Sequence, residues 1–298
     1  MLAEIWFVLF IAIVAGYLIL DGFDMGVGIL LLPLARADVE RRTFLNSIGP
    51  IWDGNEVWLV IAGAAMFAAF PTWYATMFSG FYIALLLLLV FLIVRVLSFE
   101  WRERNEHSGW LGFWAWANTI GSLGAALIWG VAFSNLLYGV PINSSGDFDG
   151  TFWDLFSLYT LLGGVAVAVD RNDKDVFPPL LPALLAIVAL LGAVVCVWLA
   201  RSGWAFVLTA GGAFLVVATI FTSLYPRVMV ASNDFANSLT VEDASSAHYT
   251  LKVMSVVALI VAPIVLLYQG WTYHVFRARL SGEEEPSPAD LRPRETGA

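Results

Sequence analysis

A long, largely apolar stretch at residues 5–33 is the feature that most restricts how this chain can fold. A helix needs about 20 apolar residues to cross the hydrocarbon core of a bilayer, and several further stretches of this length follow. Apolar residues make up 60% of the 298 residues and charged residues only 13%, which is unusual for a soluble domain. The stretches are continuous rather than alternating, which disfavours a β-barrel. We therefore expect an all-α, polytopic membrane helical bundle.

Eight membrane spans are predicted from the apolar stretches. They lie at residues 5–33, 51–70, 78–98, 111–139, 152–169, 178–200, 203–225 and 251–276. The fifth is the weakest, because Asp154 and an early stop at Asp170 shorten it. Residues 1–279 are expected to form one transmembrane domain. Residues 280–298 are charged and contain proline, so they are expected to form a disordered cytoplasmic tail.

Basic residues in short loops predict which loops face the cytoplasm. They cluster after the first span, at the end of the third and after the last, at Arg36, Arg41, Arg42, Arg95, Arg102, Arg104, Arg277 and Arg279. The loop at residues 139–152 has no basic residue, and in the loop 226–250 acidic residues outnumber Arg227, so both are expected outside. This places the N-terminus outside and the C-terminus in the cytoplasm.

The number of predicted spans disagrees with this orientation. An even number of crossings that starts outside must also end outside, whereas the basic residues require an odd number. The error should lie between the loop 139–152 and residue 226. The suspect junction is Val169–Asp170, where a glycine-rich apolar stretch breaks off into DRNDKD. We expect that a segment containing one span is missing there. The alternative is that residues 152–169 are re-entrant rather than spanning.

Two carboxylates, Asp21 and Asp24, stand one helical turn apart within the first span, in the sequence DGFDMGVG. Residues three apart on a helix face the same way. A charge at the bilayer centre costs about 2.5–3.5 kcal/mol on insertion scales, so such residues face protein or water. If the first span runs inward from Ile5, Asp21 lies about 24 Å from its outer end. The pair is therefore expected in the cytoplasmic half of the membrane.

Three further carboxylates are predicted at a similar depth. Asp53 and Glu56 begin the second span, again three residues apart, and Glu100 ends the third span. Closely spaced carboxylates in a medium of low dielectric constant titrate as a coupled group and exchange protons. Asp21, Asp24, Asp53, Glu56 and Glu100 are thus candidates for a proton pathway from the cytoplasm. Sequence shows only that their depths are compatible.

Structural roles are the alternative for these acidic residues. Asp53 could cap the second helix, with Glu56 completing a capping box, and Asp24 could pair with an arginine. The neighbouring glycines favour close helix packing: Gly22, Gly26 and Gly28 form a face of small residues, and similar faces occur at Gly63/Ala64 and Gly121/Gly124.

Metal and haem ligands are sparse. The three histidines, His107, His248 and His274, lie in loops or at a span end, and the single cysteine, Cys196, excludes an internal disulfide. Methionines along apolar helices usually fill the core. Nucleotide-binding and Ser/His/Asp motifs are not found, no cleavable signal peptide is expected, and no nucleic acid partner is expected. We expect no redox chemistry from this chain alone.

Two stretches nevertheless resemble a known family. GFDMGVG with the following RTFLNSIGPIWDGNEVWLVIAGAAMFAAFP, and the late segment SLTVEDASSAHYTLKVMSVVALIVAPIVLLYQGWTYHVF, resemble subunit II of the cytochrome bd quinol oxidases. The resemblance covers residues 1–169 and roughly 170–280. It implies nine spans in the plasma membrane, with the N-terminus outside and the C-terminus inside.

The resemblance also implies a division of labour. Subunit I of such oxidases holds the haems b and d and the quinol-binding loop, and the complex oxidises quinol and reduces O₂ to water with cytoplasmic protons. Subunit II is thought to line part of the proton path. Asp53, in WDGN, matches the family carboxylate assigned to that path, and Asp21 and Asp24 match the acids of the first helix. Some members hold a structural quinone in subunit II, although no motif here identifies a site for one.

The sequence departs from the family at Val169–Asp170, where the end of the fifth span, a loop and the sixth span are missing.

The partners that the resemblance implies are subunit I, membrane lipid, and quinol and O₂ through the complex, with a small third subunit left open. A proton-coupled transporter is the alternative, because intramembrane acids suit that function too. It would predict inverted repeats around a midplane site, whereas the two acid pairs lie on adjacent helices. A purely structural subunit is the third hypothesis.

Overall fold

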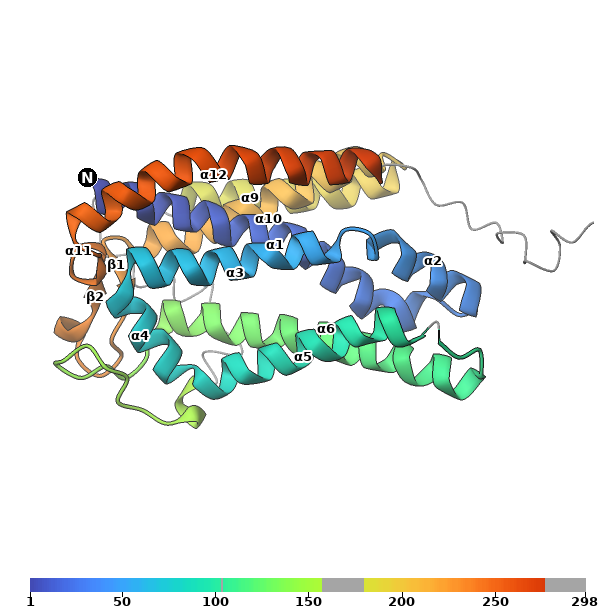
Figure 1. Cartoon of the computed structure of the whole chain (residues 1–298), viewed down its shortest axis with the longest axis horizontal. Coiled ribbons are helices and arrows are strands. Elements are labelled where there is room, and N and C mark those ends of the chain that lie inside the picture. The colour runs from blue at the N-terminus through green and yellow to red at the C-terminus, as the bar shows by residue number, and fades with distance from the viewer. Residues whose placement is uncertain (103, 157–179, 277–298) are drawn as a thin grey trace, which may run out of the picture.

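The computed structural model describes residues 1–102, 104–156 and 180–276, and these form a bundle of long helices (Figure 1). Six described helices are long and apolar enough to cross a membrane. These are α1 (Leu2–Leu34), α5 (Tyr82–Arg102), α6 (Ser108–Tyr138), α9 (Leu180–Trp198), α10 (Ser202–Leu224) and α12 (His248–Val275). The predicted membrane helical bundle is confirmed. The junction Val169–Asp170, most of the predicted span 152–169 and the tail 280–298 lie outside the described residues.

Helix α3 (Trp52–Ala69) matches the predicted second span in position and contains 18 residues. It is not among the six most apolar helices, because its first two turns contain Asp53, Asn55 and Glu56. The short helix α4 (Pro71–Gly80) begins on a proline at its first position, a favoured place because the missing N–H would be unpaired there anyway. Most of α4 lies between the predicted second and third spans, where a loop was expected, and α5 begins four residues later than the predicted third span.

Successive long helices run in opposite directions along the bundle (Figure 1). The N-terminus, α4 and the segments after α10 lie at one end. Those segments are the two-stranded antiparallel ribbon of β1 (Arg227–Met229) and β2 (Leu239–Thr240) and the one-turn helix α11 (Val241–Ala244). At the other end lie α2 (Asp38–Ile48), the α5–α6 connection and the end of α12. The basic segments that the structure describes, in α2 and at the end of α5, therefore lie at the same end of the bundle.

Helix α1 is the centre of the fold, because it contacts α3, α6, α10, α2 and α12. At the end of the bundle that holds the N-terminus, aromatic rings pack edge to face around it. The ring centroid of Phe10 lies 5.0 Å from that of Trp73 and 6.1 Å from that of Phe221. Such pairs add about 0.5–1.5 kcal/mol each to the stabilisation from burial. The opposite half of α1 instead carries the buried acids.

Helix α2 forms the surface at the basic end. The carboxylate of Glu40 accepts hydrogen bonds from the backbone N–H groups of Ala37 and Arg36, at 3.0 and 2.7 Å. These bonds hold the pKa of Glu40 below its ordinary value, because they favour the ionised form. Arg102, at the end of α5, donates to Asp38 at the start of α2. This contact holds α2 against the end of α5.

Candidate functional site: a buried charged cluster

Asp21 lies in a fully buried ion pair. Arg95, on α5, donates from Nη2 to Oδ1 of Asp21 over 2.5 Å, and both side chains are 0% exposed. Close packing of α5 against α6 brings this arginine into position. A Cβ added to Gly121 would lie 2.7 Å from the carbonyl oxygen of Phe91 and 2.9 Å from the backbone nitrogen of Arg95. Only glycine allows the two helices to approach this closely.

Glu56 extends the cluster to a third helix. Its Oε1 lies 3.9 Å from the same Nη2 of Arg95, and its side chain is 22% exposed. This separation is an ion pair without a hydrogen bond. Four buried atoms of these three residues have no hydrogen-bond partner among the described residues: Oδ2 of Asp21, Oε1 of Glu56, and Nε and Nη1 of Arg95. Because buried polar groups are normally paired, the cluster has unused donors and acceptors.

Asp24 is buried beside this pair but has a neutral partner. Asn55, on α3, donates from Nδ2 to Oδ2 of Asp24 over 2.8 Å, and both side chains are at most 1% exposed. Among the described residues, the alternative that Asp24 pairs with an arginine is therefore not met, because Arg95 pairs with Asp21. Asp21 and Glu56 thus lie within ion-pair distance of one guanidinium, and Asp24 stands one helical turn from Asp21.

Asp53 and Glu100 lie outside this cluster. Asp53 is exposed on the outer side of α3, although it is only three residues from Glu56. The capping-box alternative is also wrong, because the N-cap of α3 is Ile51 and no side chain caps the helix. Glu100 is exposed at the end of α5. The structure therefore brings together three of the five predicted acids.

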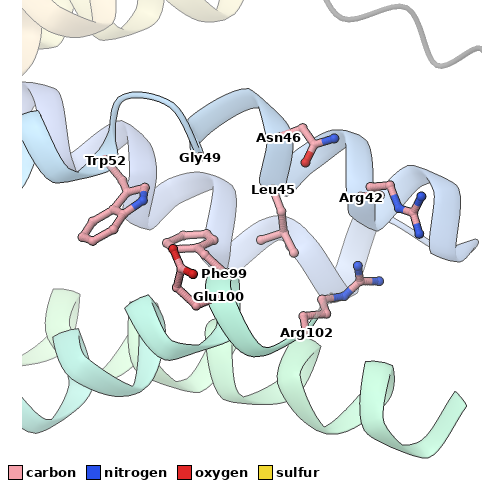
Figure 2. A pocket seen from close by; sticks show the side chains of 8 residues that line it. All are labelled: Arg42, Leu45, Asn46, Gly49, Trp52, Phe99, Glu100 and Arg102. Carbon is pink, nitrogen blue, oxygen red and sulfur yellow. The ribbon is translucent and has the colours of Figure 1, made fainter. Parts of the chain in front are cut away.

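Glu100 lines a pocket of about 200 Å³ at the basic end of the bundle, shown in Figure 2. The walls come from α2, the start of α3 and the end of α5. The lining residues are Arg42, Leu45, Asn46, Gly49, Trp52, Phe99, Glu100 and Arg102. Ordered along α5, Arg95 lies about one and a half turns from Glu100. The pocket and the buried cluster therefore share the helix α5.

Polar residues that the sequence analysis did not single out complete the site. Asn55 accepts hydrogen bonds at Oδ1 from Gln269 and Tyr273 of α12, both over 3.0 Å. On the other side, Asn118 of α6 donates to Ser98 over 2.7 Å, and Thr119 donates to the carbonyl of Gly28 over 2.9 Å. The available signal was the presence of amide side chains within apolar helices, where each needs a partner.

Histidine is not part of the cluster. His107 caps α6 by accepting a hydrogen bond from the backbone of Gly109, and His274 lies near the end of α12 against the ring of Trp271. Within residues 1–102, 104–156 and 180–276, no three His, Cys, Asp or Glu side chains are grouped to hold a metal ion. The described cluster offers carboxylates, amides and one guanidinium, which suit proton binding rather than haem ligation.

The comparisons with known proteins agree with the resemblance seen in the sequence. The sequence model of the family described as cytochrome bd terminal oxidase subunit II matches residues 2–170 and 175–276. The chain is 37% identical to cytochrome bd ubiquinol oxidase subunit 2 of Bacillus subtilis, over 95% of this chain and 98% of that protein.

Two further relatives are also second subunits of cytochrome oxidases by name. Cytochrome bd-I ubiquinol oxidase subunit 2 of Escherichia coli K12 is 32% identical, over 94% of this chain and 95% of that protein. A probable cytochrome oxidase subunit 2 of Haemophilus influenzae is 33% identical, over 93% and 94%. These matches favour an oxidase subunit over the transporter alternative. With its matched helices and its buried acids in the matched region, the chain belongs to the family of cytochrome bd terminal oxidase subunit II, and is thus a subunit of a terminal quinol oxidase.

Proposed function

We propose that this subunit delivers cytoplasmic protons to the O₂-reducing centre of a haem-bearing subunit I. The observation that carries the proposal is the charge balance of the buried cluster. Arg95 pairs with Asp21 and lies 3.9 Å from Glu56, and Asp24 stands one helical turn from Asp21, so the described cluster holds one positive charge and three carboxylates. Burying two unbalanced negative charges is costly, and the cluster avoids this cost by binding protons. A group that holds protons inside the membrane is what a proton path requires.

The pocket at the basic end supports an entry from the cytoplasm. Glu100 lines the pocket and lies on the same helix as Arg95, so protons would pass from the pocket along α5 to the cluster. This proposal keeps the N-terminus outside and the C-terminus in the cytoplasm, within the plasma membrane.

The outer face of α3 supports an exit towards subunit I. Asp53 is exposed there beside the exposed side chains of Val57 and Val60. A carboxylate facing lipid would be costly, so this face is expected to be covered by protein. Helix α12 is also largely exposed, because only 6% of the residues in its most apolar 18-residue stretch are buried within the described chain. We place subunit I, with the haems b and d, against this side. A structural quinone and a small third subunit are compatible with the exposed surface.

Neutral replacements of the acids test the proton role. Asp24→Asn and Asp53→Asn are each expected to lower the quinol oxidase turnover of the purified complex by at least about tenfold, as loss of a positioned proton-transfer group does. The haem absorption spectrum should stay unchanged, because the haems lie in the partner. Oxygen consumption with a soluble quinol measures the turnover.

Glu242→Gln is the matched control for these variants. Glu242 is an exposed acid in α11, at the other end of the bundle, and its replacement should leave turnover at the wild-type value. Wild-type turnover in both Asp24→Asn and Asp53→Asn would reject proton delivery and favour a purely structural subunit.

We also propose that the active subunit contains a segment at Val169–Asp170 that this sequence lacks. The family match is divided at this place, into residues 2–170 and 175–276. The alignment with the Bacillus subtilis relative covers 333 positions, whereas the chain has 298 residues. The relative therefore contains residues without a counterpart here.

The intact mass of the subunit in an active complex tests this proposal. The sequence as given corresponds to 32.6 kDa, and a subunit with an added loop and span is expected to be several kilodaltons heavier. Mass spectrometry of the complex from native membranes gives the answer. An active complex whose second subunit has a mass of 32.6 kDa would contradict the missing segment.

A further inference from the structure

Asn55, on α3, connects α1 with α12 through hydrogen bonds. Its Nδ2 donates to Asp24 on α1 over 2.8 Å, and its Oδ1 accepts from Gln269 and Tyr273 on α12, each over 3.0 Å. Asn55 is 0% exposed and Gln269 is 9% exposed. The glycine before Asn55 allows this approach, since a Cβ at Gly54 would lie 3.3 Å from Oε1 of Gln269. More than two hundred residues of sequence separate the partners, so tertiary packing alone creates the contact.

The two ends of the Asn55 amide are chemically different. The NH₂ end only donates and the oxygen only accepts, whereas an ionised carboxylate only accepts. Asp24 as a carboxylate therefore requires the NH₂ end, which leaves the oxygen facing α12. Gln269 and Tyr273 both donate to that oxygen. A reversed amide would place its oxygen against the carboxylate, and the side chains of Gln269 and Tyr273 would have to turn to accept from its NH₂ group.

We propose that Gln269 and Tyr273 are positioning residues, which hold the Asn55 amide in the orientation that donates to Asp24. The inference rests on the proposed proton role of Asp24 and adds that two residues of α12 influence its protonation. Without the two donors, the amide is free to turn its oxygen towards Asp24. That oxygen repels a carboxylate but accepts a hydrogen bond from a protonated carboxyl. Helix α12 thus sets how firmly Asp24 retains its proton.

Other charged groups near Asp24 stay in place when the donors on α12 are removed. They are Asp21 on the same helix, Arg95 on α5 and Glu56 on α3. Tyr273 is itself the titratable group that α12 presents to Asn55. A change in the titration of Asp24 after substitution on α12 therefore reports the amide rather than a lost charge.

The test is the double variant Gln269→Leu/Tyr273→Phe in the purified two-subunit complex. Infrared spectra recorded at a series of pH values show the protonated carboxyl band, and the band of Asp24 is the one that Asp24→Asn removes. In the double variant this band is expected to persist to a pH about one unit higher, the size of effect that one hydrogen bond to a charged group produces. Tyr268→Phe is the matched control, because Tyr268 is on the same helix and 65% exposed. It should leave the titration unchanged.

An unchanged Asp24 titration in the double variant would overturn the positioning role. The infrared titration and the turnover measurement test the two proposals separately. If Asp24→Asn keeps wild-type turnover, the proton role fails, while the infrared titration still tests the amide. If Asp24→Asn slows turnover and the double variant titrates as the wild type does, the positioning role alone fails.

Discussion

Arg95→Leu is expected to reduce the amount of assembled complex in the membrane by more than tenfold. The substitution leaves Asp21 buried at 0% exposure without its cation, and also removes the positive charge nearest to Glu56. Breaking a buried ion pair from one side typically costs about 3–5 kcal/mol, because an uncompensated charge remains. This is comparable to a large part of the stability of a folded protein. The measurement is the haem absorbance of the complex after detergent extraction, together with an immunoblot of this subunit.

Two further variants show whether the charge is the cause. Asp21→Leu/Arg95→Leu removes both partners and should restore most of the complex, since replacing a buried pair with apolar residues is often nearly neutral. Its turnover should remain low if the cluster carries protons. Arg104→Leu is the control for loss of an arginine near the same end of α5, because Arg104 is exposed and its guanidinium lies over the ring of Trp101. Normal amounts of complex with Arg95→Leu would contradict a structural need for the pair.

The buried acids of α1 were predictable from the sequence, because carboxylates in an apolar span must face protein or water. On α1, both acids fall on the buried stripe that also contains Tyr17, Met25 and Gly28. The sequence could not assign their partners. Arg95 was recognised only as a basic residue near a span end, and it reaches Asp21 because α5 packs closely on α6. Interhelical packing of this kind depends on rotations that a sequence does not specify.

Helix α3 shows why equal spacing did not give equal burial. Its buried stripe contains Asn55, Ala62, Met66 and Ala69. At about 100° per residue, Asp53 is about 200° away from Asn55 around the helix, on the opposite side. Glu56 lies between the two faces and is partly exposed. The stripe of small residues in the second half of α3, continued back by two turns, would have pointed to Asn55 rather than to Asp53.

The glycine faces were only partly predicted as well. Gly28 and Gly121 are at close helix contacts, as expected, since a Cβ on Gly28 would lie 2.0 Å from Oγ of Ser122. Gly22, Gly26 and Gly63 have no atom within 4 Å of an added Cβ in the described chain. These three do not pack against another described helix. A run of glycines therefore marks a candidate contact face, but the neighbouring helix decides which members are used.

Gly121→Leu is the second substitution with a large expected effect. An added Cβ would overlap backbone atoms, at 2.7 Å from the oxygen of Phe91 and 2.9 Å from the nitrogen of Arg95. Side-chain movement cannot relieve such contacts, so α5 must shift as a whole. Overpacking costs about 1–3 kcal/mol where side chains can adjust, and we expect at least the upper end here. A shift of α5 also moves Arg95 away from Asp21, which couples the packing defect to the charged cluster.

The expected result for Gly121→Leu is loss of most of the complex on size-exclusion chromatography, and low turnover in what remains. Gly130→Leu is the matched control on the same helix, since Gly130 is exposed and nothing lies within 4 Å of its added Cβ. The same substitution there should leave both the yield and the turnover unchanged. If the two leucine variants behave alike, the α5–α6 contact at Gly121 does not position Arg95, and the arginine must be held by its ion pairs alone.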